Sequence, residues 1–233
     1  MIRRSCPADR TARRDPASRL HAATIGRITR FLSRQAARPD GLAGRALSRI
    51  WVTETAAVND TAIDLLQIRP GERIVEIGFG PGRTLGRLAA VGAHATGVDV
   101  SPTMIDTAAR RNHAAIAAGH VLLHHGDGIT LPLPDNTADA VLGVHTIYFW
   151  PDPPTTLAEI ARVLRPGGRI VLAFRTADQP LPGRFDTTVY HVPTTDQATT
   201  WLQAAGLTDI HPHRRPDTAP TVTWLAATKP ANR

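Results

Sequence analysis

The run from Val75 to Gly82 has the residue types best suited to chemistry, because an acidic side chain is followed by three closely spaced glycines. It reads Val-Glu-Ile-Gly-Phe-Gly-Pro-Gly, between a strand-like stretch (Arg73 to Ile77) and a helix-like one (Thr84 to Ala90). Glycine lets the backbone turn tightly and lets a ligand lie against it. The amides that open the next helix then point at that ligand. This order of strand, glycine loop and helix predicts a site for a nucleotide-type cofactor.

The spacing of the glycines favours one cofactor over another. A dinucleotide fingerprint, G-x-G-x-x-G, needs its third glycine at position 83, which is Arg83 here. The third glycine instead comes one residue early, at Gly82, after Pro81. Glu76 precedes the first glycine, and its carboxylate would repel a pyrophosphate but suits a ligand with a cationic end. S-adenosylmethionine carries an ammonium and a sulfonium, so these residues favour S-adenosylmethionine over NAD.

Two further acids follow at positions where such a cofactor needs them. Thr96-Gly97-Val98-Asp99 reads as a second strand, and its terminal acid can accept hydrogen bonds from two ribose hydroxyls in either cofactor class. Ser101 and Pro102 then mark a helix start, as N-cap and first helical residue. Asp127, in Gly126-Asp127-Gly128 after the strand-like Val121 to His125, is placed to meet an adenine amino group.

The remaining chain alternates strand and helix patterns. Ala138 to Thr146 reads as a fourth strand, which opens with Asp139. Leu164 to Leu172 reads as a helix end, a turn and a fifth strand, and Thr155 to Leu164 as the helix before it. Thr195 to Ala205 reads as the last helix, stopped by Gly206.

The chain resembles the class I S-adenosylmethionine-dependent methyltransferases, and most closely small-molecule enzymes of bacterial type. The resemblance covers roughly residues 50–175. It is carried by Glu76 with the three glycines, Asp99, Gly126-Asp127, the Asp139 strand, the Leu-Arg-Pro-Gly-Gly turn from Leu164, and the stretch Ile147 to Pro153. It implies an α/β fold: a doubly wound, Rossmann-like, seven-stranded sheet with an antiparallel last strand, for which Val222 to Thr228 is the candidate, and added N-terminal helices.

The resemblance also implies a function and a set of cofactor contacts. The expected activity is methyl transfer from S-adenosyl-L-methionine to a small-molecule acceptor, at an O, N or C atom. The expected cofactor-binding residues are Glu76, Gly78, Phe79, Gly80, Gly82, Asp99, Val100, Met104, Gly126, Asp127, Gly128 and His145. Glu76 is expected to engage the ammonium of the cofactor, directly or through water.

Three residues are candidates for catalysis. His145 lies near the end of the fourth predicted strand, where ligands meet in such a fold, and is the first candidate for a base. Tyr148 follows it, and His191 is a second candidate base on a predicted substrate-side insertion, residues 176–193. His145 has an alternative role, a hydrogen bond to the backbone or to the cofactor carboxylate. His124 and His125 point to opposite faces of a strand, so we expect no metal site there.

Charge divides the chain into three parts. Residues 1–49 hold twelve arginines and three acidic residues, whereas the rest holds fifteen basic and seventeen acidic residues. We interpret residues 1–19 as a basic, flexible arm, residues 20–68 as a helical lid and residues 69–233 as the cofactor-binding domain. An electrostatic patch for RNA or anionic lipid is the alternative for the basic segment.

Composition favours a cytoplasmic protein of bacterial type. Cys6 is the single cysteine, so no intrachain disulfide can form, and the sequence has no apolar run near 20 residues and no signal-peptide core. Three alternatives stay open: an NAD-dependent oxidoreductase, a nucleic-acid methyltransferase that uses the basic arm, and a cofactor-binding protein without catalysis. Neither the acceptor nor the oligomeric state follows from the sequence.

Overall fold

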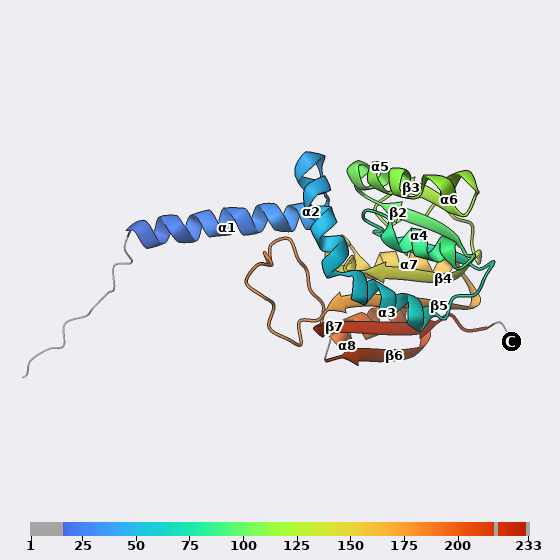
Figure 1. Ribbon diagram of the computed structural model, residues 1–233. Helices are drawn as coiled ribbons and strands as arrows, with labels where there is room; N and C mark the ends of the chain where they lie inside the picture. Colours follow the sequence, from blue (N-terminus) through green and yellow to red (C-terminus); the bar gives the residue numbers. More distant parts are fainter. Residues whose placement is uncertain (1–15, 217–218, 232–233) are drawn as a thin grey trace, which may run out of the picture.

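The chain folds into a seven-stranded sheet with helices on both faces, shown in Figure 1 as a computed structural model. The structure describes residues 16–216 and 219–231, so most of the predicted arm, residues 1–19, lies outside the described residues. The strand order is β3-β2-β1-β4-β5-β7-β6. Strands β1 to β5 pair in parallel, whereas β7 is antiparallel to both β5 and β6. The predicted sheet with an antiparallel last strand is confirmed.

Six of the seven strands follow the pattern expected from the sequence. The strands are β1 (Arg73–Ile77), β2 (His94–Asp99), β3 (Val121–His125), β4 (Ala138–Val144), β5 (Leu164–Arg175), β6 (Thr208–Arg215) and β7 (Ala219–Thr228). The sequence analysis did not locate β6, which contains Pro212 and lies at the edge of the sheet. Proline is tolerated at an edge because it removes a donor that no neighbouring strand needs.

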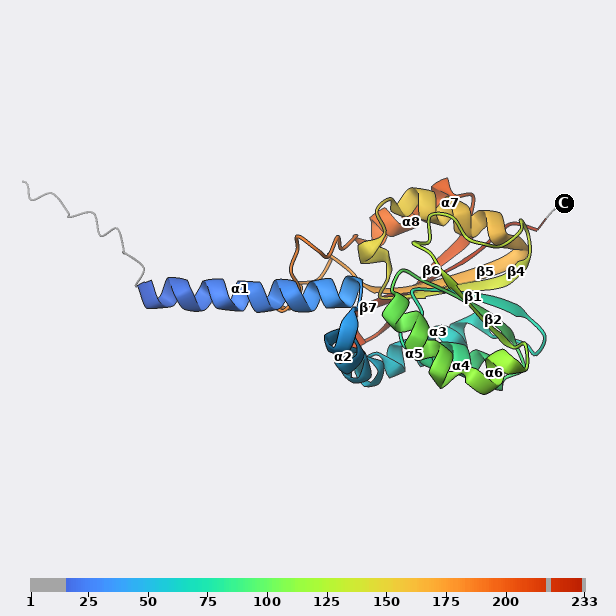
Figure 2. The same ribbon diagram turned by 90° about the horizontal axis from the view of Figure 1, so that it is seen from above.

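The helices form two layers around the sheet. They are α1 (Pro16–Ala37), α2 (Gly41–Glu54), α3 (Ala56–Leu66), α4 (Arg83–Ala90), α5 (Pro102–Arg111), α6 (His113–Ala117), α7 (Pro153–Val163) and α8 (Thr195–Ala204), with a short 3-10 turn, η1 (Ile147–Phe149). Figure 2 shows α7 and α8 on one face and α3 to α6 on the other. In both views α1 extends away from the sheet. Among the described residues, no helix is both long and apolar enough to cross a membrane.

Each face of the sheet carries its own apolar core. Side chains alternate along a strand, so Val75 and Ile77 of β1 enter the core beneath α7 and α8, and Ile74 enters the core beneath α3 and α4. All three side chains are buried. The central strands are therefore apolar on both faces, which is typical of a parallel sheet covered on both sides.

Strand β4 ends two residues earlier than predicted. The sequence pattern extended it to Thr146, but the strand stops at Val144 because His145 has a left-handed backbone, with φ of 57°. The His145 amide still donates to the carbonyl of Ala173, at 2.7 Å. The chain then turns into η1 and leaves the sheet, which aims residues 145–150 across its carboxyl edge.

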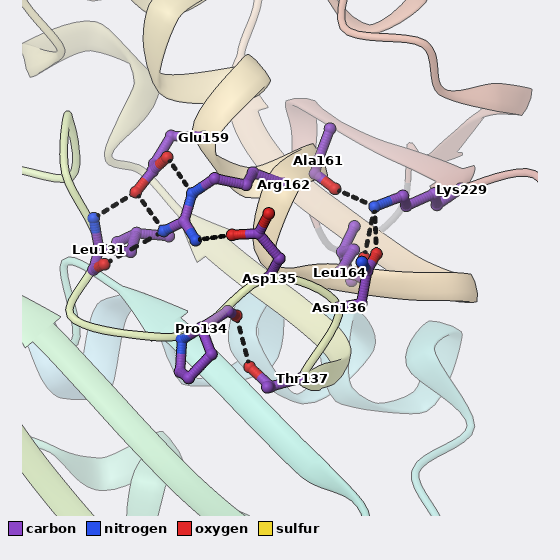
Figure 3. A network of polar contacts seen from close by, with 10 residues as sticks. All are labelled: Leu131, Pro134, Asp135, Asn136, Thr137, Glu159, Ala161, Arg162, Leu164 and Lys229. Atoms are coloured by element: carbon purple, nitrogen blue, oxygen red, sulfur yellow. Dashed lines mark hydrogen bonds and ion pairs between the residues drawn. The ribbon is translucent and has the colours of Figure 1, made fainter.

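A network of polar contacts joins the segment before β4 to α7 and to the end of β7 (Figure 3). Arg162 donates to Glu159 and Asp135, at 2.7 and 2.5 Å. Lys229 Nζ donates to the carbonyls of Ala161 and Leu164, both at 2.7 Å, and to Asn136 Oδ1, at 2.8 Å. The single lysine of the chain therefore binds the carbonyl end of α7, where a helix favours a positive charge.

Replacing this lysine should destabilise the fold. We expect Lys229→Met to lower the free energy of unfolding by about 1–3 kcal/mol, because three acceptors lose a charged donor. Urea unfolding followed by circular dichroism measures the change. Arg69→Met, at an exposed position, is the matched control and should stay within about 0.5 kcal/mol of the native chain. Equal stability of both variants would show that the Lys229 contacts contribute nothing.

Candidate active site

A cavity of about 600 Å³ opens at the carboxyl ends of the parallel strands β1 to β5. This is the edge at which ligands bind in open α/β sheets, and the volume is ordinary for a small-molecule site. Most of the residues that the sequence analysis selected line it: Glu76, Gly78, Phe79, Gly80, Asp99, Val100, Met104, Gly126, Asp127, His145 and Tyr148.

The glycine loop is held in a tight turn over β2. The amide of Gly78 donates to the carbonyl of Val98, at 2.7 Å, and that of Gly82 to the carbonyl of Phe79, at 3.1 Å. Gly78 has a φ of 70°, and a Cβ there would collide with the side chain of Thr146. Only glycine suits this position, because any side chain would strain the backbone and displace Thr146.

Glu76, at the centre of the sheet on β1, is a buried carboxyl group that lacks a full set of partners. It is 3% exposed, and its Oε2 has no hydrogen-bond partner among the described residues. Burial, with a smaller contribution from nearby Asp99, raises the pKa of Glu76 to about 8. A buried acid of this kind is stabilised by a cation that reaches it through the cavity.

Asp99 ties the glycine loop to the end of β2. Its Oδ2 accepts from the amide of Gly80 and its Oδ1 from the amide of Ser101, both at 2.8 Å. Burial raises the pKa of Asp99 to about 6, and these amide bonds counteract the rise. Each carboxylate oxygen can accept more than one hydrogen bond, so Asp99 retains acceptor capacity toward the cavity.

Asp127 and Met104 complete the far side of the cavity. Asp127 is exposed, and its Oδ1 accepts from the amide of Ile129, at 3.0 Å, which fixes the side chain in a local turn. Met104 is fully buried in the first turn of α5. As predicted, Ser101 caps this helix by accepting from the amide of Met104, with Pro102 as first helical residue.

His145 and Tyr148 form a hydrogen-bonded pair on the cavity wall. His145 Nδ1 lies 2.9 Å from Tyr148 Oη, and the same Oη accepts from the amide of Arg175. Among the described residues, His145 Nδ1 is the one acceptor that this phenolic hydrogen meets. We therefore assign the Tyr148 hydroxyl as donor to Nδ1, which leaves the ring hydrogen of neutral His145 on Nε2.

The surroundings of the pair keep both side chains neutral. Burial lowers the pKa of His145 to about 4, and the positive charge of Arg175 adds to the effect. Burial also raises the pKa of Tyr148 above its usual value. In this state His145 offers an N–H donor to the cavity, whereas a general base would need a free lone pair on Nε2.

Three of the predicted site residues do not line the cavity, namely Gly82, Gly128 and His191. Gly82 instead allows α4 and α5 to approach, because a Cβ there would lie 2.6 Å from that of Ala108. His191 is exposed, and its amide donates to the carbonyl of Tyr148, at 3.2 Å. This position gives no support to His191 as a base.

Comparisons with known proteins agree with this arrangement. A family model described as a methyltransferase domain matches residues 75–172. An uncharacterized methyltransferase of Bacillus subtilis, YdaC, is 33% identical over 128 residues, which cover 54% of this chain and 68% of the relative. The chain belongs to the class I S-adenosylmethionine-dependent methyltransferases.

Other similarities cover different shares of the chain. The O-methyltransferase cnsE of Penicillium expansum is 34% identical over 113 residues, 48% of this chain and 41% of the relative. The chain thus spans less than half the length of several curated relatives that it matches. The [4+2]-cyclase SpnF has a similar fold, with a TM-score of 0.63 and 20% identity over 93% of this chain and 98% of the cyclase.

Helices α1 and α2 and the 176–193 segment cover the cavity of this methyltransferase fold and form its roof. Ser33 of α1 and Trp51 of α2 line it. The Ser33 hydroxyl accepts from the amide of Asp186, at 3.1 Å, and Asp186 pairs with Arg30, also at 3.1 Å. On the opposite side, the Ser101 hydroxyl donates to the carbonyl of Pro39. The sequence analysis expected helices here but selected none of these contacts.

Two further cavity residues were missed by the sequence analysis. Thr146 Oγ1 is buried without a hydrogen-bond partner among the described residues, next to Gly78. Arg175, the last residue of β5, also lines the cavity. Both residues lie at the carboxyl ends of strands, β4 and β5, where ligands bind in such a fold. A search for polar residues at the predicted strand ends would therefore have found them. Within the part of the chain that the structure describes, no group of three or more His, Cys, Asp or Glu residues is placed to hold a metal.

The raised pKa of Glu76 predicts a pH-dependent stability for the ligand-free protein. Its folded-state pKa of about 8 exceeds the ordinary value of 4.5, so the folded protein retains a proton that the unfolded chain releases between these values. The contribution of Glu76 to stability is therefore complete below pH 4.5 and is lost as the pH rises through about 8. We expect Glu76→Gln to lose less stability than the native chain between pH 5 and 8.

Urea unfolding at pH 5, 6.5 and 8 measures this difference. Glu54→Gln serves as the control, since Glu54 is exposed and its variant should keep the native pH dependence. The same loss of stability in Glu76→Gln and the native chain would contradict the raised pKa.

Proposed function

We propose that this protein transfers the methyl group of S-adenosylmethionine to a small-molecule acceptor. The observation that carries the proposal is Glu76 Oε2, a buried carboxyl oxygen without a partner among the described residues, on the wall of the same cavity as the glycine loop. An ammonium group is the complement that such an oxygen lacks. A pyrophosphate in its place would bring negative charge next to a buried acid and offer it no compensating cation.

The residues of the cavity suit the parts of this cofactor. In the proposal, Glu76 and Thr146 receive the amino acid end beside the glycine loop, Asp99 accepts from the ribose hydroxyls, and Asp127 meets the adenine amino group. When bound, S-adenosylmethionine supplies a methyl group already activated by a sulfonium. The main tasks of the chain are therefore to bind and orient the two reactants and to exclude water, because the methyl group needs little further activation.

The roof of the cavity is proposed to orient the two reactants and to exclude water. We propose that residues 20–68 act as a lid, with support from the cavity-lining residues of α1 and α2 and from the contacts of Ser33 and Pro39. Alignment of two reactants can supply roughly 7–11 kcal/mol of a barrier. A closed apolar wall also strengthens the polar interactions inside it.

His145 is proposed to contact the acceptor. Its hydrogen bond with Tyr148 and its lowered pKa support a neutral ring that donates from Nε2 and holds the acceptor in place. A base role for His145 requires the other tautomer, with Nδ1–H donated to Tyr148 Oη. As a donor to the acceptor, His145 needs a hydrogen on Nε2, whereas as a base it needs a lone pair there. Substitution can therefore separate the two roles.

Thermal unfolding with S-adenosylmethionine, S-adenosylhomocysteine and NAD in parallel tests the cofactor. A ligand at 100 times its dissociation constant stabilises by about 2.7 kcal/mol, or about 5–10 °C in a chain of this size. We expect shifts with both adenosyl-sulfur ligands and none with NAD. Asp99→Asn should weaken S-adenosylhomocysteine binding at least tenfold because the ribose loses a charged acceptor, whereas Asp64→Asn, at an exposed position, should not.

A shift with NAD alone would contradict the proposed cofactor. Unchanged affinity in Asp99→Asn would contradict the ribose assignment alone. Binding without turnover on a broad panel of acceptors would favour a cofactor-binding protein without methyl transfer.

Substitution of His145 tests its role in turnover. We expect His145→Ala to lower turnover about 100-fold and to leave S-adenosylhomocysteine affinity within about threefold, because the ring is proposed to meet the acceptor. His145→Gln keeps an N–H donor and should recover at least tenfold over the alanine variant. Equal loss in both variants would instead favour a base, and full turnover in His145→Ala would remove His145 from the acceptor site. Steady-state kinetics and calorimetry provide both readouts.

A further inference from the structure

Arg175 is a cation placed at the carboxyl end of β5, on the cavity wall. Its backbone amide is fixed by Tyr148 Oη, and its Nη1 donates to Thr221 Oγ1. Its Cζ lies 5.3 Å from the centroid of the Phe185 ring. The half-buried guanidinium is thus held between a strand end and an aromatic face, beside the His145–Tyr148 pair.

The positive charge of Arg175 is not neutralised by the protein. Of the other arginines on the cavity wall, Arg83 pairs with Asp60 at 2.7 Å and Arg184 approaches Glu54 at 3.9 Å. Arg38 also forms no ion pair among the described residues, but its side chain is exposed to solvent. Arg175 forms no ion pair with any carboxylate among the residues described. A guanidinium has five N–H donors, so the single side-chain hydrogen bond to Thr221 leaves most of them available. A partly buried charge of this kind is stabilised by an anion.

Three of the four acidic residues that line the cavity lie elsewhere, and the fourth, Glu54, approaches Arg184. Glu76, Asp99 and Asp127 extend from the ends of β1, β2 and β3, where the cofactor is proposed to bind. Arg175 ends β5, which is separated from β1 by β4. The cavity therefore has an acidic half, suited to the ammonium and ribose of the cofactor, and a half with an uncompensated cation.

Aromatic rings line the same half as Arg175. Tyr190 packs against Phe149 and Phe185, with ring centroids 4.8 and 4.9 Å apart, and against Tyr148 at 5.4 Å. Phe149, Phe185 and Tyr190 all line the cavity. Their surfaces suit a planar, apolar molecule, and Arg175 at their border suits a negative group on it.

We propose that the methyl acceptor is an anion, a planar apolar molecule with a carboxylate or phosphate group, and that Arg175 binds this group. The inference rests on the proposed function, since it names the class of acceptor for the same cavity. Arg175 is then the residue that determines specificity for charge, and the aromatic rings determine specificity for shape.

Paired probes with and without an anionic group test this inference. Isothermal titration compares 3,4-dihydroxybenzoate with 3,4-dihydroxybenzamide, 4-hydroxycinnamate with 4-hydroxycinnamamide, and phenyl phosphate with phenol, on protein saturated with S-adenosylhomocysteine. We expect the anion of at least one pair to bind at least tenfold more tightly than its neutral partner. The pair that shows the preference separates a carboxylate acceptor from a phosphate acceptor.

Arg175→Gln should reduce that preference to less than threefold, because glutamine keeps a polar side chain without the charge. Arg215→Gln, at an exposed position on β6 outside the cavity, should keep the full preference. Unchanged S-adenosylhomocysteine affinity and thermal unfolding temperature of Arg175→Gln confirm that the variant is folded. The inference is overturned by the absence of a tenfold preference in the native chain, or by its persistence in Arg175→Gln.

The same titrations without S-adenosylhomocysteine keep this result separate from the proposed function. If the native chain does not bind S-adenosylhomocysteine, the proposed function is contradicted. The charge preference of the ligand-free cavity still tests whether Arg175 binds an anion.

Discussion

The desolvation of Glu76 is the constraint on which the rest of the site depends. A carboxyl group in the centre of a parallel sheet has no water to stabilise its charge, and β1 lies between β2 and β4, so the group cannot reach solvent except through the cavity. The protein meets this constraint by keeping the carboxyl protonated near neutral pH, as the raised pKa shows. A cationic ligand then gains a partner that is already in place and that no other residue occupies.

The glycine loop and Asp99 follow from the same constraint. For a ligand to reach Glu76, the chain after β1 must leave the space above the strand end free, and the positive φ of Gly78 makes this turn possible. Asp99 holds the loop in that conformation through the amides of Gly80 and Ser101. Two buried acids thus lie close together in different roles: Asp99 is held by backbone amides and shapes the loop, whereas the protonated Glu76 has an oxygen without a partner among the described residues.

The roof depends on how α3 is fixed to the sheet. Trp224 donates from its indole nitrogen to the carbonyl of Val58, at 3.0 Å, and Arg169 donates to the carbonyls of Leu66 and Gln67 at the end of the helix. Orphan carbonyls at a helix end are satisfied in this way by side chains of the sheet. Helix α2 directly precedes the anchored α3 and lines the cavity. Helix α1 extends away from the sheet (Figures 1 and 2).

The sequence alone determined the local elements and pointed to the residues of the proposed cofactor half of the site. Strands β1 and β3, the Ser101 cap and the glycine loop follow from periodicity, capping and the absence of a Cβ, which act between residues a few positions apart. Asp99 and Glu76 follow from their spacing to that loop. These signals are local, so they are readable without knowledge of the tertiary contacts.

Only the tertiary structure brought together the residues of the proposed acceptor half. The tautomer of His145 depends on Tyr148 and on the amide of Arg175, which is 30 residues away in the chain. The proposed role of Arg175 depends on the lack of an ion pair with any described carboxylate. It also depends on Phe185 and Thr221, which contact the guanidinium. The position of His191 outside the cavity depends on the path of the 176–193 segment. No periodicity encodes such contacts, because each joins distant residues through a packing arrangement that exists only after the chain has folded.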